Sequence, residues 1–208
     1  MSSRYLIPAV SRHRVEESIK RSRFIATLAH VQCPEEARAF VAEIKEEFPD
    51  ATHNCWAFAA GSPGETAHVG LSDDGEPHGT AGKPMLNALL HSGVGEIAAV
   101  VTRYFGGVKL GTGGLVRAYS GLVSLGLESL PTKEKVELSL VQAVIPYTFV
   151  TLFKRMLPDF EAEVAEESFE VDASFLVRLP SEHVRAFEKE LLDMTKGEAL
   201  FSPSQEHP

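Results

Sequence analysis

The feature that most constrains the fold of this chain is a change in its character near residue 131. Fifteen of the 16 glycines lie before this point, and only Gly197 follows it. Residues 129–135 hold a proline and mixed charges, and they interrupt the apolar patterns on either side. Such a shift in composition is typical of a domain boundary. With 208 residues the chain has room for two small domains, and the sequence predicts them at residues 1–131 and 132–208.

The second half alternates between strand and helix patterns. Apolar and polar residues alternate as in strands over residues 136–146, 162–167 and 168–179, and residues 199–201 form a last short strand. Helical spacing is expected over residues 148–157 and from Ser181 onward, with Thr148 and Ser181 as N-caps and Gly197 as C-cap. The resulting βαββαβ order is that of a ferredoxin-like domain.

The first half also mixes strands and helices. Strands are expected at residues 24–31, 53–60 and 97–101. A helix begins at Pro34, another covers residues 80–91, and a long one runs from near Thr112 to residue 130. The sequence therefore predicts an α+β fold for the whole chain.

An acidic loop follows the second expected strand. It carries Asp73, Asp74 and Glu76 among glycines and prolines, and Lys83 closes it. With His53, these carboxylates could hold a divalent metal, although the spacing is neither that of an EF-hand nor that of a Walker A loop. The alternative is a turn whose acids cap the backbone N–H groups of the next helix.

A glycine-rich loop follows the third expected strand. Its glycines precede a helix, a geometry that points free backbone N–H groups at an anion. The predicted anion-binding residues are Arg103, Lys109, Gly111, Thr112, Gly113, Gly114 and Arg117. The alternative is a tight strand-to-helix turn without a ligand, which explains the glycines but not the three basic residues beside them.

Charge is distributed unevenly along the chain. The net charge of −9 argues against indiscriminate nucleic-acid binding, and residues 131–208 carry 15 acidic and only 8 basic side chains. Up to residue 23 the chain instead carries six basic side chains, Arg21 and Arg23 among them, against two acidic ones. One surface could therefore bind phosphate while the rest repels it, or the segment is an ordinary solvated face.

The two cysteines, Cys33 and Cys55, form no metal or disulfide pattern. His53 and Cys55 share one face of a strand and could form a nucleophile pair, but two small buried thiols in a reduced cytoplasmic protein are the expected interpretation. The sequence shows no signal-peptide core, no apolar run of membrane-spanning length and no hydrolase signature.

Two stretches carry a family resemblance. Residues 72–86, SDDGEPHGTAGKPML, and residues 103–119, RYFGGVKLGTGGLVRAY, resemble the signature loops of the Impact family in its bacterial YigZ-like branch. The similarity covers residues 4–208 in order. It departs from the family pattern at Asn54, where relatives often carry a second histidine.

The resemblance implies a fold and a function. The first domain should be similar to the second domain of ribosomal protein S-five, with helices on one face of a mixed sheet. The second should resemble a ferredoxin-like domain of elongation factor G. The family is associated with translation regulation, which implies a non-enzymatic cytoplasmic factor, with no cofactor and no membrane contact, that binds RNA, the ribosome or a translation factor.

Two other functions stay open. One is a Mg²⁺-dependent enzyme or binding protein for a nucleotide or phosphorylated small molecule. In that case the acidic loop would hold the ion, and Lys83, Arg103 and Lys109 would meet phosphate. The other is a protein–protein adaptor whose glycine loops are purely structural.

Overall fold

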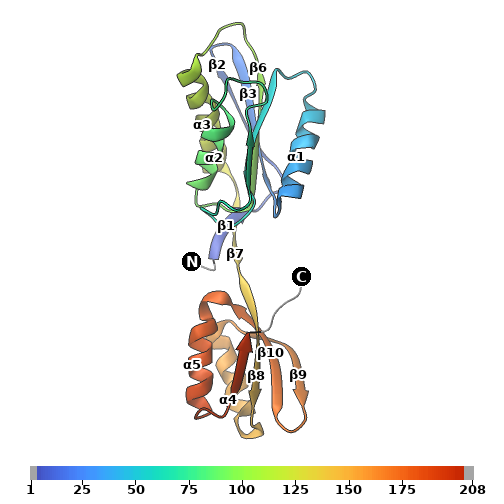
Figure 1. Ribbon diagram of the computed structural model, residues 1–208, viewed down its shortest axis with the longest axis vertical. Coiled ribbons are helices and arrows are strands. Elements are labelled where there is room, and N and C mark those ends of the chain that lie inside the picture. The colour runs from blue at the N-terminus through green and yellow to red at the C-terminus, as the bar shows by residue number, and fades with distance from the viewer. Residues whose placement is uncertain (1–3, 204–208) are drawn as a thin grey trace. The chain divides into compact units, whose positions relative to one another are not determined.

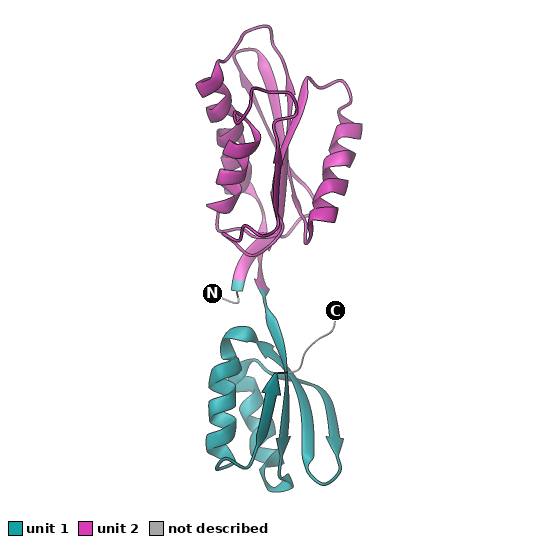
Figure 2. Ribbon diagram, in the orientation of Figure 1, with its two compact units in different colours: residues 1–4, 136–208 teal, residues 5–135 magenta. Residues whose placement is uncertain are grey.

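The computed structural model describes residues 4–203, which fall into two compact units (Figure 2). The N-terminal unit comprises residues 5–135, and the C-terminal unit comprises residues 136–203 together with Arg4. The chain passes between them after Lys135, a few residues beyond the boundary that the change in composition suggests. The two-unit α+β architecture predicted from sequence is confirmed.

The N-terminal unit is built on a five-stranded sheet. Every neighbouring pair of strands in it is antiparallel, where the family resemblance implies a mixed sheet. In sheet order the strands are β2 (His13–Ile19), β3 (Ser22–His30), β6 (Ile97–Tyr104), β4 (His53–Ala59) and β5 (Val69–Ser72).

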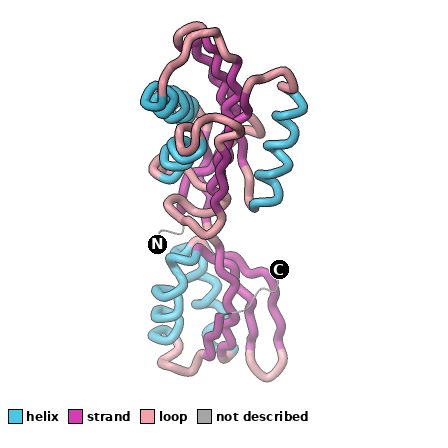
Figure 3. The backbone as a smooth tube through the Cα atoms, turned by 45° about the horizontal axis from the view of Figure 1, so that its top comes forward, coloured by secondary structure: helices cyan, strands magenta, loops and turns pink. Residues whose placement is uncertain are grey.

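Helices cover both faces of this sheet, so the expectation of helices on one face is wrong. Helix α1 (Pro34–Glu47) packs on one face, and α2 (Gly82–Leu90) and α3 (Thr112–Ser129) pack on the other (Figures 1 and 3). The reason is visible in β6, where successive apolar residues supply both cores: Val101 belongs to the α2–α3 side and Val100 to the α1 side.

A short two-stranded ribbon completes the unit. It pairs β1 (Arg4–Pro8) with β7 (Thr132–Val136). The buried Glu96 ties this ribbon to the sheet: its carboxylate accepts hydrogen bonds from Tyr5 Oη at 3.0 Å and from Lys135 Nζ, and lies 2.8 Å from His30 Nε2. Both ends of the N-terminal unit therefore meet at one carboxylate.

The C-terminal unit has the predicted βαββαβ order. Its four-stranded antiparallel sheet has the order β11-β8-β10-β9, as in ferredoxin-like domains. The elements are β8 (Leu138–Ile145), a 3-10 turn (Tyr147–Phe149), α4 (Val150–Met156), a second turn (Leu157–Phe160), β9 (Glu163–Phe169), β10 (Ala173–Pro180), a third turn (Ser181–His183), α5 (Val184–Met194) and β11 (Leu200–Pro203).

Aromatic packing holds this unit together, and its helix starts differ from expectation. Phe153 packs on Phe175 at 4.7 Å between ring centroids and on Phe187 at 6.1 Å. Neither Thr148 nor Ser181 caps a helix with its side chain, because each lies inside a 3-10 turn that precedes the α-helix. Gly197 does adopt the expected left-handed conformation, with φ of 83°.

No helix within residues 4–203 combines the length and the apolar character needed to cross a membrane.

Candidate functional site

The acidic loop (residues 73–81) and the glycine loop (residues 105–111) lie at the same end of the N-terminal sheet. Strand β6 runs into the glycine loop, and its Arg103 pairs in register with His53 at the start of β4. Strand β3 begins beside it, with Arg23 opposite Tyr104. The topology thus brings both signature loops to the C-terminal end of the central strand β6.

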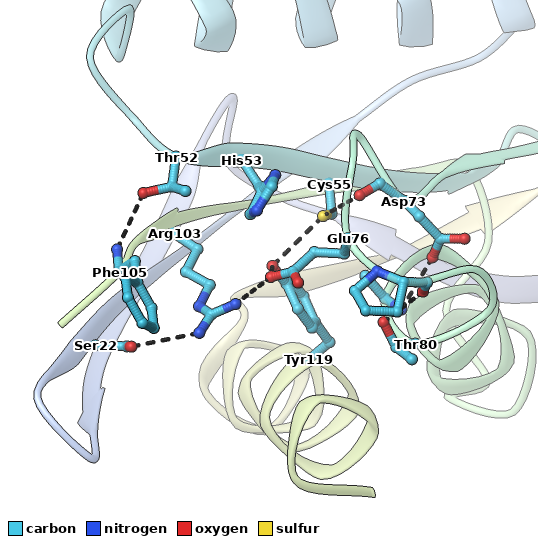
Figure 4. Close-up of polar contacts among 12 residues, drawn as sticks. Ser22, Thr52, His53, Cys55, Asp73, Glu76, Thr80, Arg103, Phe105 and Tyr119 are labelled. Carbon is cyan, nitrogen blue, oxygen red and sulfur yellow. Dashed lines mark hydrogen bonds and ion pairs between the residues drawn. The ribbon is translucent and has the colours of Figure 1, made fainter. Parts of the chain in front are cut away.

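A buried ion pair joins the acidic loop to the end of β6, just before the glycine loop. Arg103 Nη1 donates to Glu76 Oε1 at 2.5 Å, and the side chains are only 6% and 3% exposed (Figure 4). Arg103 Nη2 also donates to Ser22 Oγ at 3.4 Å, while its Nε has no hydrogen-bond partner within residues 4–203. The prediction that Arg103 contacts phosphate is corrected here, because its guanidinium is enclosed under the loops and neutralised by Glu76.

Tyr119 and Cys55 extend this buried network. Tyr119 Oη donates to Glu76 Oε1 at 2.8 Å, and Cys55 Sγ lies 3.4 Å from Tyr119 Oη and 2.9 Å from the carbonyl oxygen of Asp73. The spacing of four residues between Leu115 and Tyr119 places Tyr119 on the buried stripe of α3.

Cys55 is not an activated nucleophile. Burial raises the pKa of its thiol to about 12, so the thiolate is not available near neutral pH. His53 Nδ1 instead lies 2.8 Å from the carbonyl oxygen of Asp74. The expectation of two buried thiols holds for Cys55 but not for Cys33, which is only partly buried at the start of α1.

The carboxylate of Asp73 serves the backbone of its own loop. It accepts hydrogen bonds from the N–H groups of Gly79 at 2.7 Å, Ala81 at 3.0 Å and Gly82 at 2.9 Å. Burial acts to raise the pKa of Asp73, but these three bonds outweigh it and leave the pKa lowered. The capping alternative is the one that describes this residue.

Asp74 is likewise occupied within the fold. It accepts hydrogen bonds from Lys45 Nζ at 2.6 Å and from the N–H of Asn54 at 2.7 Å. Burial opposes ionisation, yet Lys45 and the Asn54 bond keep the pKa of Asp74 lowered. With Glu76 committed to Arg103, the acids point at different partners, and no group of three or more potential metal ligands is found within residues 4–203. The residues do not fit a Mg²⁺ site.

Basic side chains around the loops differ in whether an acid neutralises them. Arg23 pairs with Glu16 through two hydrogen bonds of 2.7 and 2.8 Å, and Arg14 pairs similarly with Glu47. Five exposed cations around the loops have no ion pair or side-chain hydrogen bond with the described residues. We call them the basic rim: Lys20, Arg21, Lys83, Lys109 and Arg117.

Local backbone geometry positions the basic rim. Lys20 and Arg21 form the β2–β3 turn in left-handed conformations, with φ of 47° and 68°. This turn presses on the glycine loop so closely that a Cβ at Gly106 would lie 1.9 Å from the carbonyl oxygen of Arg21. Lys109 lies in the glycine loop itself, so it and the β2–β3 turn share one edge.

The first turn of α3 adds backbone donors to this edge. The helix begins after Gly111, whose φ of 76° requires glycine, and no side chain caps it. The N–H groups of Thr112, Gly113 and Gly114 have no acceptor within residues 4–203. The Arg117 guanidinium would lie 3.9 Å from a Cβ at Gly113. Positive charge and free amides together suit an anion.

Comparison with known proteins identifies the family. The Impact N-terminal domain matches residues 20–127, and a domain of unknown function (DUF1949) matches residues 144–198. The chain is 45% identical over 193 residues to the IMPACT family member YigZ of Escherichia coli, which covers 93% of this chain and 94% of that protein. An IMPACT family member of Haemophilus influenzae is 44% identical over 193 residues, with 93% of both chains covered.

A more distant relative and a solved structure also match this chain. The human Protein IMPACT is 30% identical over 102 residues, 48% of this chain and 31% of that protein. A crystal structure described as that of a hypothetical protein is 42% identical, aligns over 100% of both chains and has a TM-score of 0.68. On the strength of the two matched domains and the bacterial relatives, this chain belongs to the Impact family.

Proposed function

We propose that this protein is a cytoplasmic regulator of translation whose N-terminal unit binds ribosomal RNA through the basic rim. The observation that carries the proposal is the cluster of unneutralised cations beside the uncapped first turn of α3. The three acids of the acidic loop, Asp73, Asp74 and Glu76, are engaged inside the fold, so they do not cancel this charge. Phosphate oxygens are the ligands that such a surface binds best.

The family relation supports a translation-linked ligand. The bacterial relatives share nearly the whole chain, and the mammalian relatives named Protein IMPACT share about half of it. The acidic surplus of the second half favours a directed contact, in which the basic rim meets RNA and the remainder is repelled by phosphate.

Co-sedimentation with ribosomes and separated subunits over a series of salt concentrations tests this function. Binding should weaken steeply with salt, because every neutralised phosphate releases counterions. A variant with Arg21→Ala and Lys109→Ala should bind more weakly at each salt concentration. Its slope of log affinity against log salt should fall by about 0.7–0.9 for each lost contact.

A matched control separates position from charge. Arg12→Ala with Arg14→Ala removes the same charge from cations that already pair with Glu43 and Glu47, so ribosome binding should remain close to that of the parent. An equal loss in both variants would contradict a specific basic rim. Absence of pelleting even at low salt would overturn the proposal and favour a small phosphorylated ligand, whose binding would raise the melting temperature.

A further inference from the structure

We propose, as a refinement that rests on the proposed function, that Phe105 is a stacking platform for an unpaired base and that the RNA is single-stranded where it crosses the glycine loop. Phe105 is the first residue after β6 and its side chain is 48% exposed. Val108, three residues on, is also exposed. The two exposed apolar side chains thus share one loop with Lys109, a member of the basic rim.

The position of Phe105 is fixed even though its ring is exposed. Its N–H donates to Thr52 Oγ1 at 3.0 Å, which ties the residue to the segment before β4. The next residue, Gly106, donates its N–H to Ser22 Oγ at 3.1 Å. The ring is therefore presented by an anchored backbone, so ordering it on binding costs little entropy.

The buried ion pair supports the ring from below. The Arg103 guanidinium lies 5.6 Å from the centroid of the Phe105 ring and 5.2 Å from that of Phe24. Figure 4 shows Arg103 between Phe105 and Glu76, which holds the guanidinium in place. One side of the Phe105 ring thus faces a fixed cation, and the exposed remainder is available to a base.

The surrounding charges suit the backbone of such a strand. The carbonyl of Arg21 packs at Gly106, Lys109 follows within the same loop, and the free amides of α3 begin at Thr112. A base paired in a duplex has both faces covered by its neighbours, whereas an unpaired base offers a face to an aromatic side chain. This juxtaposition of a supported ring and phosphate donors therefore selects single-stranded RNA.

Fluorescence anisotropy with two labelled RNAs tests this inference: an unstructured oligouridine and a hairpin duplex of equal length, at the same salt concentration. The parent should bind the single strand more tightly. Phe105→Ala and Phe105→Leu should each weaken single-strand binding about ten-fold and leave its salt slope unchanged, because stacking is lost and the phosphate contacts remain. Phe105→Trp should retain binding.

The Phe105→Trp variant gives a direct readout. Single-stranded RNA should quench its tryptophan fluorescence well beyond that of the parent, whose sole tryptophan is Trp56. Thermal melting confirms that each variant is folded. Equal binding of duplex and single strand, no effect of Phe105→Ala, or no added quenching would each overturn the inference. Those outcomes would not contradict ribosome binding by the basic rim, because that proposal is tested separately by co-sedimentation of the Arg21→Ala, Lys109→Ala variant.

Discussion

At the scale of single residues, the Arg103–Glu76 ion pair links the end of β6 to the acidic loop, 27 positions away in sequence. Both partners are almost fully buried, and the Arg103 Nε has no hydrogen-bond partner within residues 4–203. Burying two charges is costly, so a pair of this kind is weak evidence for a stabilising role. Its position directly under Phe105 gives it a role in holding the proposed RNA-contact surface.

A double-mutant cycle measures this coupling. Glu76→Gln should lower the free energy of unfolding by about 3 kcal/mol or more, because Arg103 is left as a buried charge without a counterion. Adding Arg103→Met should recover part of the loss, since no unpaired charge then remains. Urea unfolding gives the values. Glu16→Gln, which breaks the exposed pair with Arg23, is the matched control and should have no measurable effect. Similar losses for both glutamates would contradict the assigned burial.

At the scale of elements, the sequence predicts those whose pattern is strong. The helices at Pro34–Glu47 and Thr112–Ser129 follow clear apolar stripes, and the central strands are apolar runs. The sequence pattern does not predict the strands at His13–Ile19 and Val69–Ser72, because they lie at the two edges of the sheet and bury few side chains. Edge strands are defined by pairing with a distant neighbour, which local periodicity does not report.

The candidate site was only partly predictable for a similar reason. The sequence points to both signature loops and to Lys109 and Arg117, which are exposed in the structure. The burial of Arg103 depends on a side chain 27 residues away, and the anchoring of Phe105 depends on Thr52. The local spacing of residues carries no signal for either contact. The sequence leaves two roles open for Asp73, and only the positions of the Gly79, Ala81 and Gly82 amides decide between them.

Two glycines with opposite surroundings test the packing of the glycine loop. A Cβ at Gly106 would overlap the backbone of Arg21, so Gly106→Ala should destabilise the protein by about 2 kcal/mol or more. Gly121 lies inside α3 with open space around the same position, and Gly121→Ala should stabilise it by about 0.5–1 kcal/mol. Thermal melting of both variants measures the contrast. Equal shifts would mean that the β2–β3 turn does not pack on the glycine loop as described.

At the scale of the whole molecule, the two units have separate hydrophobic cores. Phe187 belongs to the core of the C-terminal unit, and Leu122 belongs to that of the N-terminal unit. Trp56, the only tryptophan, lies on β4 in the N-terminal unit. Tryptophan fluorescence therefore reports the unfolding of one unit, while circular dichroism reports both.

Substitutions in each core should be resolved by these two probes. Phe187→Ala should lower the free energy of unfolding of the C-terminal unit by about 3–5 kcal/mol. Part of the circular dichroism transition should then move to lower denaturant concentration, while the Trp56 fluorescence transition keeps its midpoint. Leu122→Ala is the counterpart and should shift the Trp56 transition to lower denaturant concentration. If Phe187→Ala moved the Trp56 transition by the same amount, the two cores would unfold as one cooperative body.

The meeting of Tyr5 and Lys135 at Glu96 has a consequence for protein engineering. The chain enters and leaves the N-terminal unit at adjoining strands, in the manner of a domain inserted into a host. Residues 5–135 thus form a cassette whose ends can be joined by a short linker. New termini placed between Thr66 and Ala67, in the exposed β4–β5 connection, would then give a circular permutant of this unit.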